Sequence, residues 1–275
     1  MFQQPITLTL VAAAVVGLLL LSGTANSQAF VLGCPSPALP TPPPANALGI
    51  DASCPIQGTG PKEAAQNTAK NNFCAGGPAQ PITIDDMKTL QQNVQTNSKI
   101  NFGNPRDHPL SRTPGPTKDR TPLRTLGEGT LRSLQGFVFA VRQEKKETVN
   151  CGTNVPNNDL FHDIHISIVA DEASTHGDEC TTVVVEMSPH HRPDSWTAAN
   201  LQRVATKHKL VRVTGQLFFD SSHTPCQDDK EIPGDPRRVS LWELHPIYKF
   251  DVCNAASCTT ETEWIPLDQW LTQNP

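Results

Sequence analysis

Several residue types are scarce in this 275-residue sequence. It contains one Tyr and three Met, and only 5% of its residues are aromatic and 18% charged. Lys and Arg number 22 against 27 Asp and Glu, for a formal net charge of -5. Without a basic excess, a polybasic coat for nucleic acid is excluded. With one long apolar run, a protein with several membrane spans is excluded as well.

The sequence also lacks the short motifs of several enzyme classes. It has no G-x-S-x-G elbow, Walker loop or dinucleotide fingerprint, which disfavours serine hydrolase, P-loop and nicotinamide chemistry. No two cysteines have the C-x-x-C spacing of a zinc ribbon or a thioredoxin-like site. The closest pair, Cys253 and Cys258, has four residues between its members.

The one long apolar run lies at the N-terminus, where residues 6–21 read ITLTLVAAAVVGLLLL. Small residues follow it, so the pattern predicts a signal peptide over residues 1–27, cleaved before Gln28. The leader carries no Lys or Arg, which leaves an uncleaved anchor as an alternative. We therefore expect a secreted, periplasmic or cell-envelope protein with no membrane span after cleavage.

All eight cysteines follow this leader: Cys34, Cys54, Cys74, Cys151, Cys180, Cys226, Cys253 and Cys258. An even number of cysteines in an exported chain predicts disulfides, although the spacing does not give the pairing. Three of them lie in the N-terminal part and five in the C-terminal part. Odd numbers on both sides require one bridge between the two parts.

The segments before residue 135 are predicted to be tethers, loops and short helices. Residues 28–50 form a Pro-rich tether, and residues 51–134 form a helical and irregular arm. Within this arm, residues 62–71 are rich in Ala, and Thr83 to Asp86 form a capping-box pattern before an apolar helical face. Residues 101–126, rich in Pro and Arg, are expected to wrap the following domain.

From residue 135 onward, alternating apolar residues predict five strands. They cover residues 136–141, 163–169, 181–187, 210–220 and 240–252, with a helix from about Pro193 to Lys207 capped by Asp194 or Ser195. Three strands, a helix and two strands is the element order of an OB-fold, a five-stranded Greek-key barrel. We expect a mainly β OB-like barrel over residues 135–253 and a C-terminal tail over residues 254–275.

Three of these strands place polar residues on one face. Where the isoleucines of residues 163–169 face the core, Asp163 and His165 face outward, and the same alternation turns Glu186, Glu243 and His245 outward. In an OB barrel the third strand lies between the second and the fifth. These five side chains are therefore expected on one continuous outer surface.

This group has the composition of a metal or acid–base site. His165, Glu186 and His245 are candidate ligands for a divalent ion such as Zn²⁺ or Mn²⁺, and Asp163 or Glu243 is the candidate catalytic base. The alternative is an ordinary solvated sheet face with a cross-strand Glu–His pair. Further binding candidates are Asp220 and His223 at the edge of the group, and Arg238, a possible anion contact.

Charge divides unevenly along the chain. Residues 28–135 hold ten basic and seven acidic residues, whereas residues 136–253 hold twelve and seventeen. An acidic barrel is a poor partner for a phosphate backbone, so nonspecific nucleic-acid binding is disfavoured.

Residues 53–252 resemble a group of uncharacterised secreted or envelope bacterial proteins. The segments that carry the resemblance are residues 53–55, 70–72, 127–129, 147–151, 163–165, 184–189 and 212–217 and, most specifically, the Trp-Glu-Leu-His-Pro-Ile run of residues 242–247. The resemblance implies an OB-like domain with an N-terminal arm and no known activity. The additional cysteines Cys74, Cys226, Cys253 and Cys258 depart from its pattern.

Two functional hypotheses follow. The first is an exported binding module whose outer face engages an extracellular glycan, nucleic-acid or protein ligand. The second is a metal-dependent hydrolase, such as a phosphodiesterase or nuclease, that uses the His and Glu cluster.

Overall fold

The computed structural model describes residues 54–60, 63–97, 100, 120–152, 161–226 and 236–275. The signal peptide and the tether predicted for residues 1–50 lie outside these residues, as does most of the predicted wrapping loop. The described chain contains the helices α2 (Ala64–Lys70), α3 (Ile84–Thr96), α4 (Thr121–Thr125), α5 (Ala198–Thr206) and α6 (Leu267–Gln273). Its strands are β1 (Gln80–Ile82), β2 (Leu131–Gln143), β3 (Ile164–Val169), β4 (Val183–Met187), β5 (Leu210–Phe219), β6 (Trp242–Cys253) and β7 (Trp264–Pro266).

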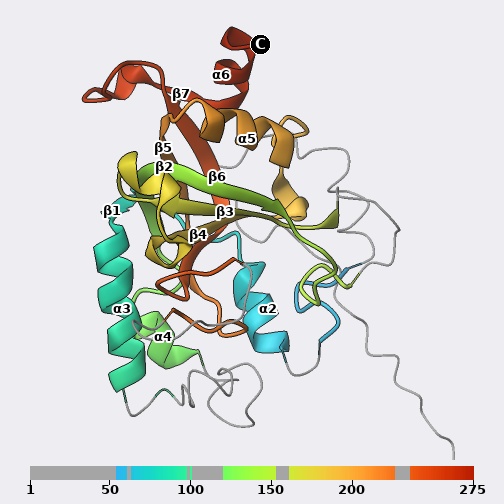
Figure 1. The fold of residues 1–275 in the computed structure, drawn as a ribbon. Coiled ribbons are helices and arrows are strands. Elements are labelled where there is room, and N and C mark those ends of the chain that lie inside the picture. Colours follow the sequence, from blue (N-terminus) through green and yellow to red (C-terminus); the bar gives the residue numbers. More distant parts are fainter. Residues whose placement is uncertain (1–53, 61–62, 98–99, 101–119, 153–160, 227–235) are drawn as a thin grey trace, which may run out of the picture.

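Five of the strands form a closed barrel. Their order is β2-β3-β4-β6-β5, and β5 pairs back with β2 to close it. All neighbours are antiparallel except β4 and β6, which run parallel. This is the predicted OB-like arrangement, in which the third strand of the barrel lies between the second and the fifth, with α5 between the third and the fourth along the chain (Figure 1).

The barrel strands lie close to their predicted positions, with differences at their ends. β2 extends from Leu131 to Gln143, well beyond the predicted 136–141, because its first half pairs with β5 and its second half with β3. Gly136 lies near this change of partner, and a Cβ there would be 2.4 Å from the Val169 carbonyl oxygen. The close approach of the two strands therefore requires glycine.

The predicted cap of α5 is wrong. The helix begins at Ala198, and the Thr197 side chain accepts a hydrogen bond from the Asn200 backbone N–H. Asp194 and Ser195 instead lie in a turn, closed by a hydrogen bond from the Trp196 N–H to the Pro193 carbonyl oxygen. The predicted capping box at Thr83 is confirmed, since its hydroxyl and the Asp86 carboxylate bond reciprocally to the backbone of α3.

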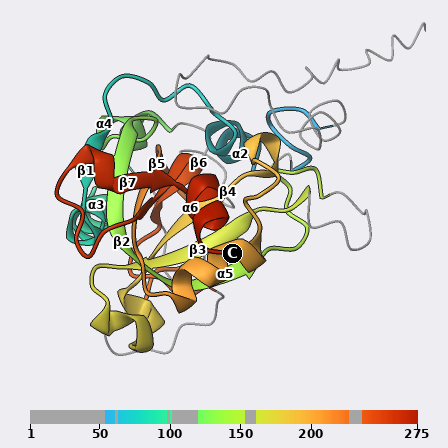
Figure 2. The same ribbon diagram turned by 90° about the horizontal axis from the view of Figure 1, so that it is seen from above.

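One hydrophobic cluster fills the barrel and continues into the N-terminal arm. It includes Ile166, Val185 and Leu244 from the barrel together with Met87 and Val94 from α3. In Figure 1, α2, α3 and α4 lie below the barrel, and α5 and α6 lie above it; Figure 2 shows the same elements from above. No described residue of α2 belongs to a hydrophobic cluster.

The segment after the barrel also folds onto it. Residues 264–266 form β7, which pairs antiparallel with β6, and α6 follows directly. Among the described residues, no helix has the length and apolar character needed to cross a membrane.

Three disulfides join described cysteines: Cys54–Cys151, Cys180–Cys226 and Cys253–Cys258. Cys74 is disulfide-bonded as well. The Cys54–Cys151 bond links the N-terminal part of the chain to the barrel, which is the kind of bridge that the odd cysteine counts required. The described chain is therefore a disulfide-stabilised small β-barrel.

Removal of the Cys54–Cys151 bond is expected to destabilise the fold more than removal of the Cys253–Cys258 bond. The two bonds close sequence separations of 97 and 5 residues. The chain-entropy relation then gives losses of about 5 and about 2 kcal/mol. Denaturant unfolding of the two double Cys→Ala variants measures both losses, and equal losses would contradict this expectation.

Candidate functional site

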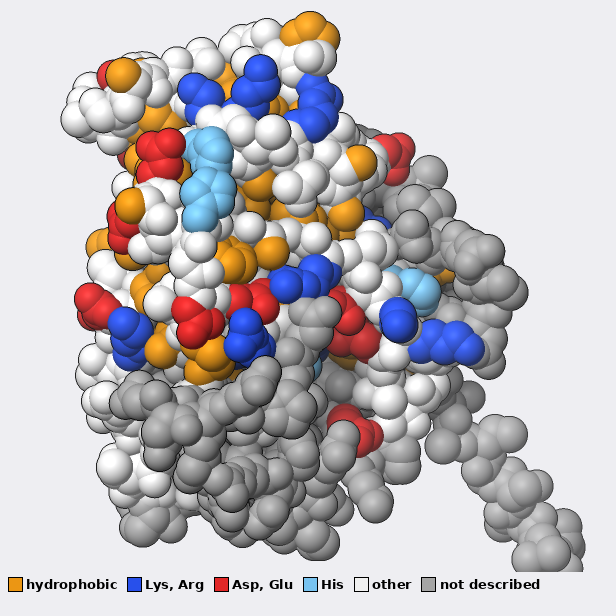
Figure 3. Space-filling view, viewed as in Figure 1, with side chains coloured by type: hydrophobic (Ala, Val, Ile, Leu, Met, Phe, Trp, Pro, Cys, Tyr) orange, Lys and Arg blue, Asp and Glu red, His pale blue; other side chains and the backbone are white. Residues whose placement is uncertain are grey.

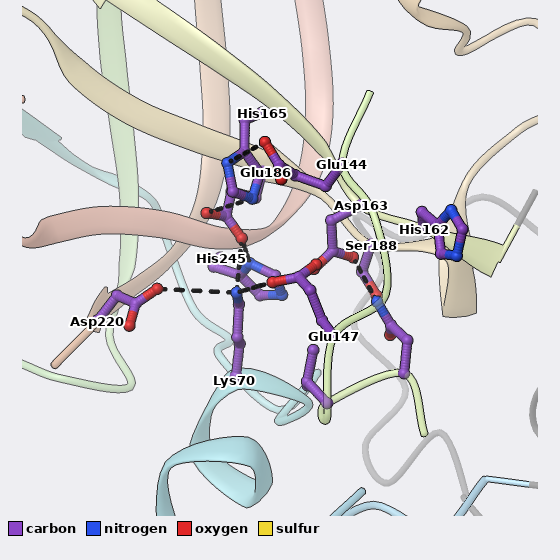
Figure 4. Close-up of polar contacts among 12 residues, drawn as sticks. Lys70, Glu144, Glu147, His162, Asp163, His165, Glu186, Ser188, Asp220 and His245 are labelled. Carbon is purple, nitrogen blue, oxygen red and sulfur yellow. Dashed lines mark hydrogen bonds and ion pairs between the residues drawn. The ribbon is translucent and has the colours of Figure 1, made fainter. Parts of the chain in front are cut away.

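The five side chains predicted to share a face do lie together on one side of the sheet. His165 on β3 pairs directly with Glu186 on β4, and the neighbouring pair Val185 and Leu244 aligns β4 with β6. Glu243 and His245 flank Leu244 and so point away from the core, like Glu186. Asp163 immediately precedes β3 and extends the same row (Figure 4).

The expectation that this face is an open outer surface is wrong. The side chains of Asp163, Glu186, Glu243 and His245 are 0% exposed, and that of His165 is 3% exposed. The alternative of a solvated sheet face is excluded for the same reason. Helix α2 and residues 144–151 cover this side of the barrel. Helix α2 places a long basic side chain among the carboxylates (Figure 4).

The basic side chain is Lys70, at the last position of α2. Its Nζ lies 2.9 Å from Glu186 Oε2, 3.4 Å from Glu147 Oε1 and 3.8 Å from an oxygen of both Asp163 and Asp220. The four carboxylates hold the pKa of Lys70 well above its usual range, although burial alone would lower it. One ammonium thus contacts four carboxyl groups that come from separate segments.

Glu186 is the most highly connected carboxylate of the group. Its Oε1 lies 3.0 Å from His165 Nε2, and its Oε2 lies 2.6 Å from His245 Nδ1, in addition to the contact with Lys70. Burial alone would raise the pKa of Glu186, but the two imidazoles and the ammonium hold it well below its usual range. Glu186 is therefore ionised and is the negative centre of the site.

His165 also reaches a second carboxylate at the edge of the site. Its Nδ1 lies 3.2 Å from Glu144 Oε1. Burial opposes protonation of this ring, yet the surrounding carboxylates, Glu186 first, raise the pKa of His165. Burial lowers the pKa of His245, and the nearby Lys70 charge lowers it further. The two imidazoles on either side of Glu186 therefore differ in their affinity for a proton.

Asp220 and His223, predicted at the edge of the group, lie at one of its ends. His223 Nε2 is 3.5 Å from Asp220 Oδ2, and the Gln66 side-chain amide of α2 donates to Asp220 Oδ1 at 3.0 Å. Burial, together with the Arg238 charge, lowers the pKa of His223 to about 4. The imidazole is therefore neutral at neutral pH and available as a ligand.

The sequence predicts that Arg238 contacts an external anion, and this prediction is wrong. Its Nη1 lies 2.9 Å from Glu243 Oε2, and its side chain is 1% exposed. The guanidinium is therefore an internal partner of the acidic group. The guanidinium turns inward because a buried carboxylate such as that of Glu243 is stable only with a nearby counter-charge or a proton.

Carboxyl groups outnumber Lys and Arg side chains in this buried site. Lys70 and Arg238 face five carboxyl groups, which are Glu147, Asp163, Glu186, Asp220 and Glu243. Burial raises the pKa of Glu147 to about 8 and that of Glu243 well above its usual range. Bound protons therefore replace part of the missing positive charge.

Several of the acidic and imidazole groups are close enough to share a cation. Three sets have ligand atoms within 4.8 Å of one another: Glu147, Asp163 and His165; Asp163, Glu186 and His245; and Glu186, Asp220 and Glu243. Ligands of one ion at about 2.1 Å lie about 3 to 4 Å apart, so small side-chain adjustments close each set. Among the described residues, the predicted set of His165, Glu186 and His245 is not one of the three.

Some buried polar atoms within the group have no hydrogen-bond partner. They include Glu243 Oε1, Asp163 Oδ2 and His245 Nε2, all on side chains that are 0% exposed. Glu243 Oε1 faces the group, 3.8 Å from His245 Nδ1. Buried polar atoms without partners are costly, and a cation would satisfy acceptors of this kind.

The group reaches the surface at two places. The side chains of Glu144 and Glu147 are 24% and 23% exposed on one side, and His223 is 30% exposed on the other. These three side chains are where the group is in contact with solvent.

Sequence reasoning missed Lys70 and Glu147 as members of the site. Glu147 lies between strands, where no alternation predicts its direction. Lys70 lies in an Ala-rich segment, yet its helix carries Gln66, Asn67 and Lys70 on the buried face in place of an apolar stripe. A helix with a polar buried face is the signal that could have revealed a polar partner surface.

A comparison with protein-family models, curated proteins and solved structures finds no match to this chain. The resemblance to uncharacterised envelope proteins stays a prediction.

Replacement of Lys70 by Ala is expected to lower the free energy of unfolding by about 3 to 5 kcal/mol, because it leaves buried carboxylates without their cation. The matched control is Lys88→Ala, which removes an exposed pair with Asp85 and is expected to cost less than about 1 kcal/mol. Denaturant unfolding measures both, and equal losses would show that the Lys70 contacts contribute little.

Glu147→Gln is expected to reduce the dependence of stability on pH. Burial raises the pKa of Glu147 to about 8, so the folded protein retains a proton that the unfolded chain releases above about pH 4.3. The stability linked to this proton is complete below the unfolded pKa and is lost as pH rises through about 8. Between pH 6.5 and 8, the wild type should lose about 1 to 2 kcal/mol more than the variant. Parallel unfolding curves for the two proteins would contradict a protonated Glu147.

Proposed function

We propose that this exported, disulfide-stabilised barrel binds a divalent metal ion in the buried group, with Asp163, Glu186 and His245 as ligands. The observation that carries the proposal is the excess of buried carboxyl groups over cations, around atoms that lack hydrogen-bond partners. An ion would replace the protons that the group otherwise retains.

The mixed ligand set favours Zn²⁺ or Mn²⁺. One imidazole nitrogen and two carboxylates suit these ions, whereas Ca²⁺ and Mg²⁺ prefer oxygen ligands alone. The set of Glu186, Asp220 and Glu243 has only oxygen ligands and would suit the harder ions. Metal selectivity therefore distinguishes which of the two sets is used.

A glycan, nucleic-acid or protein ligand on the same face has less support. Such a ligand needs an open surface, and helix α2 covers this one. On the face drawn in Figure 3, acidic and basic side chains lie interspersed among the described residues. A phosphate backbone is instead bound by several basic groups together.

Export is part of the proposal. Cys54, Cys151, Cys180, Cys226, Cys253 and Cys258 pair in three disulfides, and disulfides persist in oxidising compartments such as the periplasm or the extracellular space. The signal peptide predicted for residues 1–27 agrees with this location.

The experiment is equilibrium dialysis of the chelator-treated protein against Zn²⁺ and against Mn²⁺, followed by elemental analysis. The wild type is expected to retain one equivalent, and Glu186→Gln or His245→Gln should weaken binding at least about 100-fold, since even outer-shell changes cost about 10- to 100-fold. His176→Gln is the matched control, because His176 is exposed and lies outside the site. Binding that survives both site substitutions would place the ion elsewhere and overturn the proposal.

A metal-dependent hydrolase is the second candidate, and the position of Glu147 favours it. This carboxyl is 23% exposed at the edge of the site and lies 3.4 Å from Lys70 Nζ, where a substrate could exchange a proton with it. The catalytic residues predicted from the sequence, Asp163 and Glu243, are fully buried and less suited to that role.

The two candidates differ in one measurement. If the protein is a hydrolase, the metal-loaded form should cleave an activated phosphodiester, and Glu147→Gln should lower kcat by about 10²- to 10⁴-fold while metal binding persists. Stoichiometric metal without turnover would leave the metal-binding function alone.

A further inference from the structure

Polar contacts hold helix α2 on the barrel. Its buried residues are Gln66, Asn67 and Lys70, and among the described residues it contributes no side chain to a hydrophobic cluster. Helix α3, in contrast, buries Met87 and Val94 in the core. Segments with few buried apolar contacts are those that open locally at low cost.

The contacts of α2 with the barrel concentrate on the acidic group. Lys70 reaches four carboxylates, and Gln66 donates to Asp220 Oδ1 at 3.0 Å and accepts from the Ser221 backbone N–H at 3.1 Å. Neutral contacts add to these: Gln66 also donates to the Ser222 hydroxyl at 2.5 Å, and the Gln216 side chain of β5 donates to the Ala69 carbonyl oxygen and accepts from Asn72, each at 2.9 Å. The position of α2 therefore depends strongly on the charge of the group beneath it.

Lys70 contacts two members of every candidate ligand set. It touches Glu147 and Asp163 in the first set, Asp163 and Glu186 in the second, and Glu186 and Asp220 in the third. An ion 2.1 Å from these oxygens would occupy the space beside or at the ammonium. Two positive charges at such separations repel each other strongly in a buried site.

We propose that Lys70 and a divalent ion compete for the same carboxylates, so that metal binding withdraws Lys70 and releases α2 from the barrel face. This inference rests on the proposed metal site. In the metal-free protein the ammonium compensates the carboxylates and α2 covers the face. In the metal-bound protein the ion compensates them, and α2 loses its main attachment.

The released segment remains attached to the molecule. The Cys54–Cys151 disulfide ties its N-terminal side to the loop before β3, and Asn71 donates to the Ile56 and Val149 carbonyl oxygens. The expected motion is thus a local opening over Glu186 and His245, which gives a ligand or substrate access to the bound ion.

The first experiment is hydrogen–deuterium exchange of the full, oxidised chain with and without saturating Mn²⁺. Amides of α2, residues 64–70, should exchange at least about 10-fold faster with the ion bound, whereas those of α3, residues 84–96, should not change. If hydrogen–deuterium exchange in α2 is unchanged or slower with Mn²⁺ bound, the proposal that the ion displaces Lys70 is overturned. This measurement needs no variant and is independent of any folding defect.

The second experiment compares Mn²⁺ affinity in Lys70→Met, which keeps the apolar stem and removes the charge, with that in Lys88→Met as the control. Competition predicts that Lys70→Met binds the ion at least about 10-fold more tightly, and that Lys88→Met equals the wild type. Binding detected only in Lys70→Met also supports competition. Equal affinity in all three proteins overturns it.

The outcomes separate this inference from the metal site itself. If neither the wild type nor Lys70→Met binds Mn²⁺, both the metal site and the displacement of Lys70 are overturned. If one equivalent binds and the α2 amides remain protected from hydrogen–deuterium exchange, only the displacement of Lys70 is overturned.

Discussion

Compensation of buried carboxylates by Lys70 is the interaction on which the covered face of this barrel depends. Five carboxyl groups lie within or beside a sheet from which α2 excludes most solvent. Burial of an ionised carboxylate without a counter-charge costs several kcal/mol. The ammonium, the Arg238 guanidinium and retained protons together make the buried arrangement stable.

The barrel supplies the rigid frame for this group. Hydrogen-bonded strands set the positions of Glu186, His165 and His245, and the packed core behind them fixes the face on which they lie. The covering side is built differently, from a short helix with a polar inner face and a loop tied by a disulfide. An apolar, hydrogen-bonded half and a half held by polar contacts meet at the acidic group.

Alternation predicted the barrel well where a strand separates apolar from polar residues, as β3 does with Ile164, Ile166 and Ile168 on one face and His165 and Ser167 on the other. It was less successful where a local signal was ambiguous: Asp194, Ser195 and Thr197 are all good caps, and a turn after Pro193 selected the last. Strands β1 and β7 have three residues each, too few for any periodic pattern. These short strands form because β2 and β6 offer them backbone hydrogen-bond partners, and this depends on how the whole sheet is assembled.

The sequence by itself determined the barrel order and the shared direction of His165, Glu186 and His245, since the period of two in a strand assigns every side chain to a face. Only the tertiary structure decided that this face is buried, that Lys70 and Glu147 belong to it, and that Arg238 is an internal partner. The physical reason is that alternation reports the side of the sheet on which a residue lies, and long-range packing decides what covers that side.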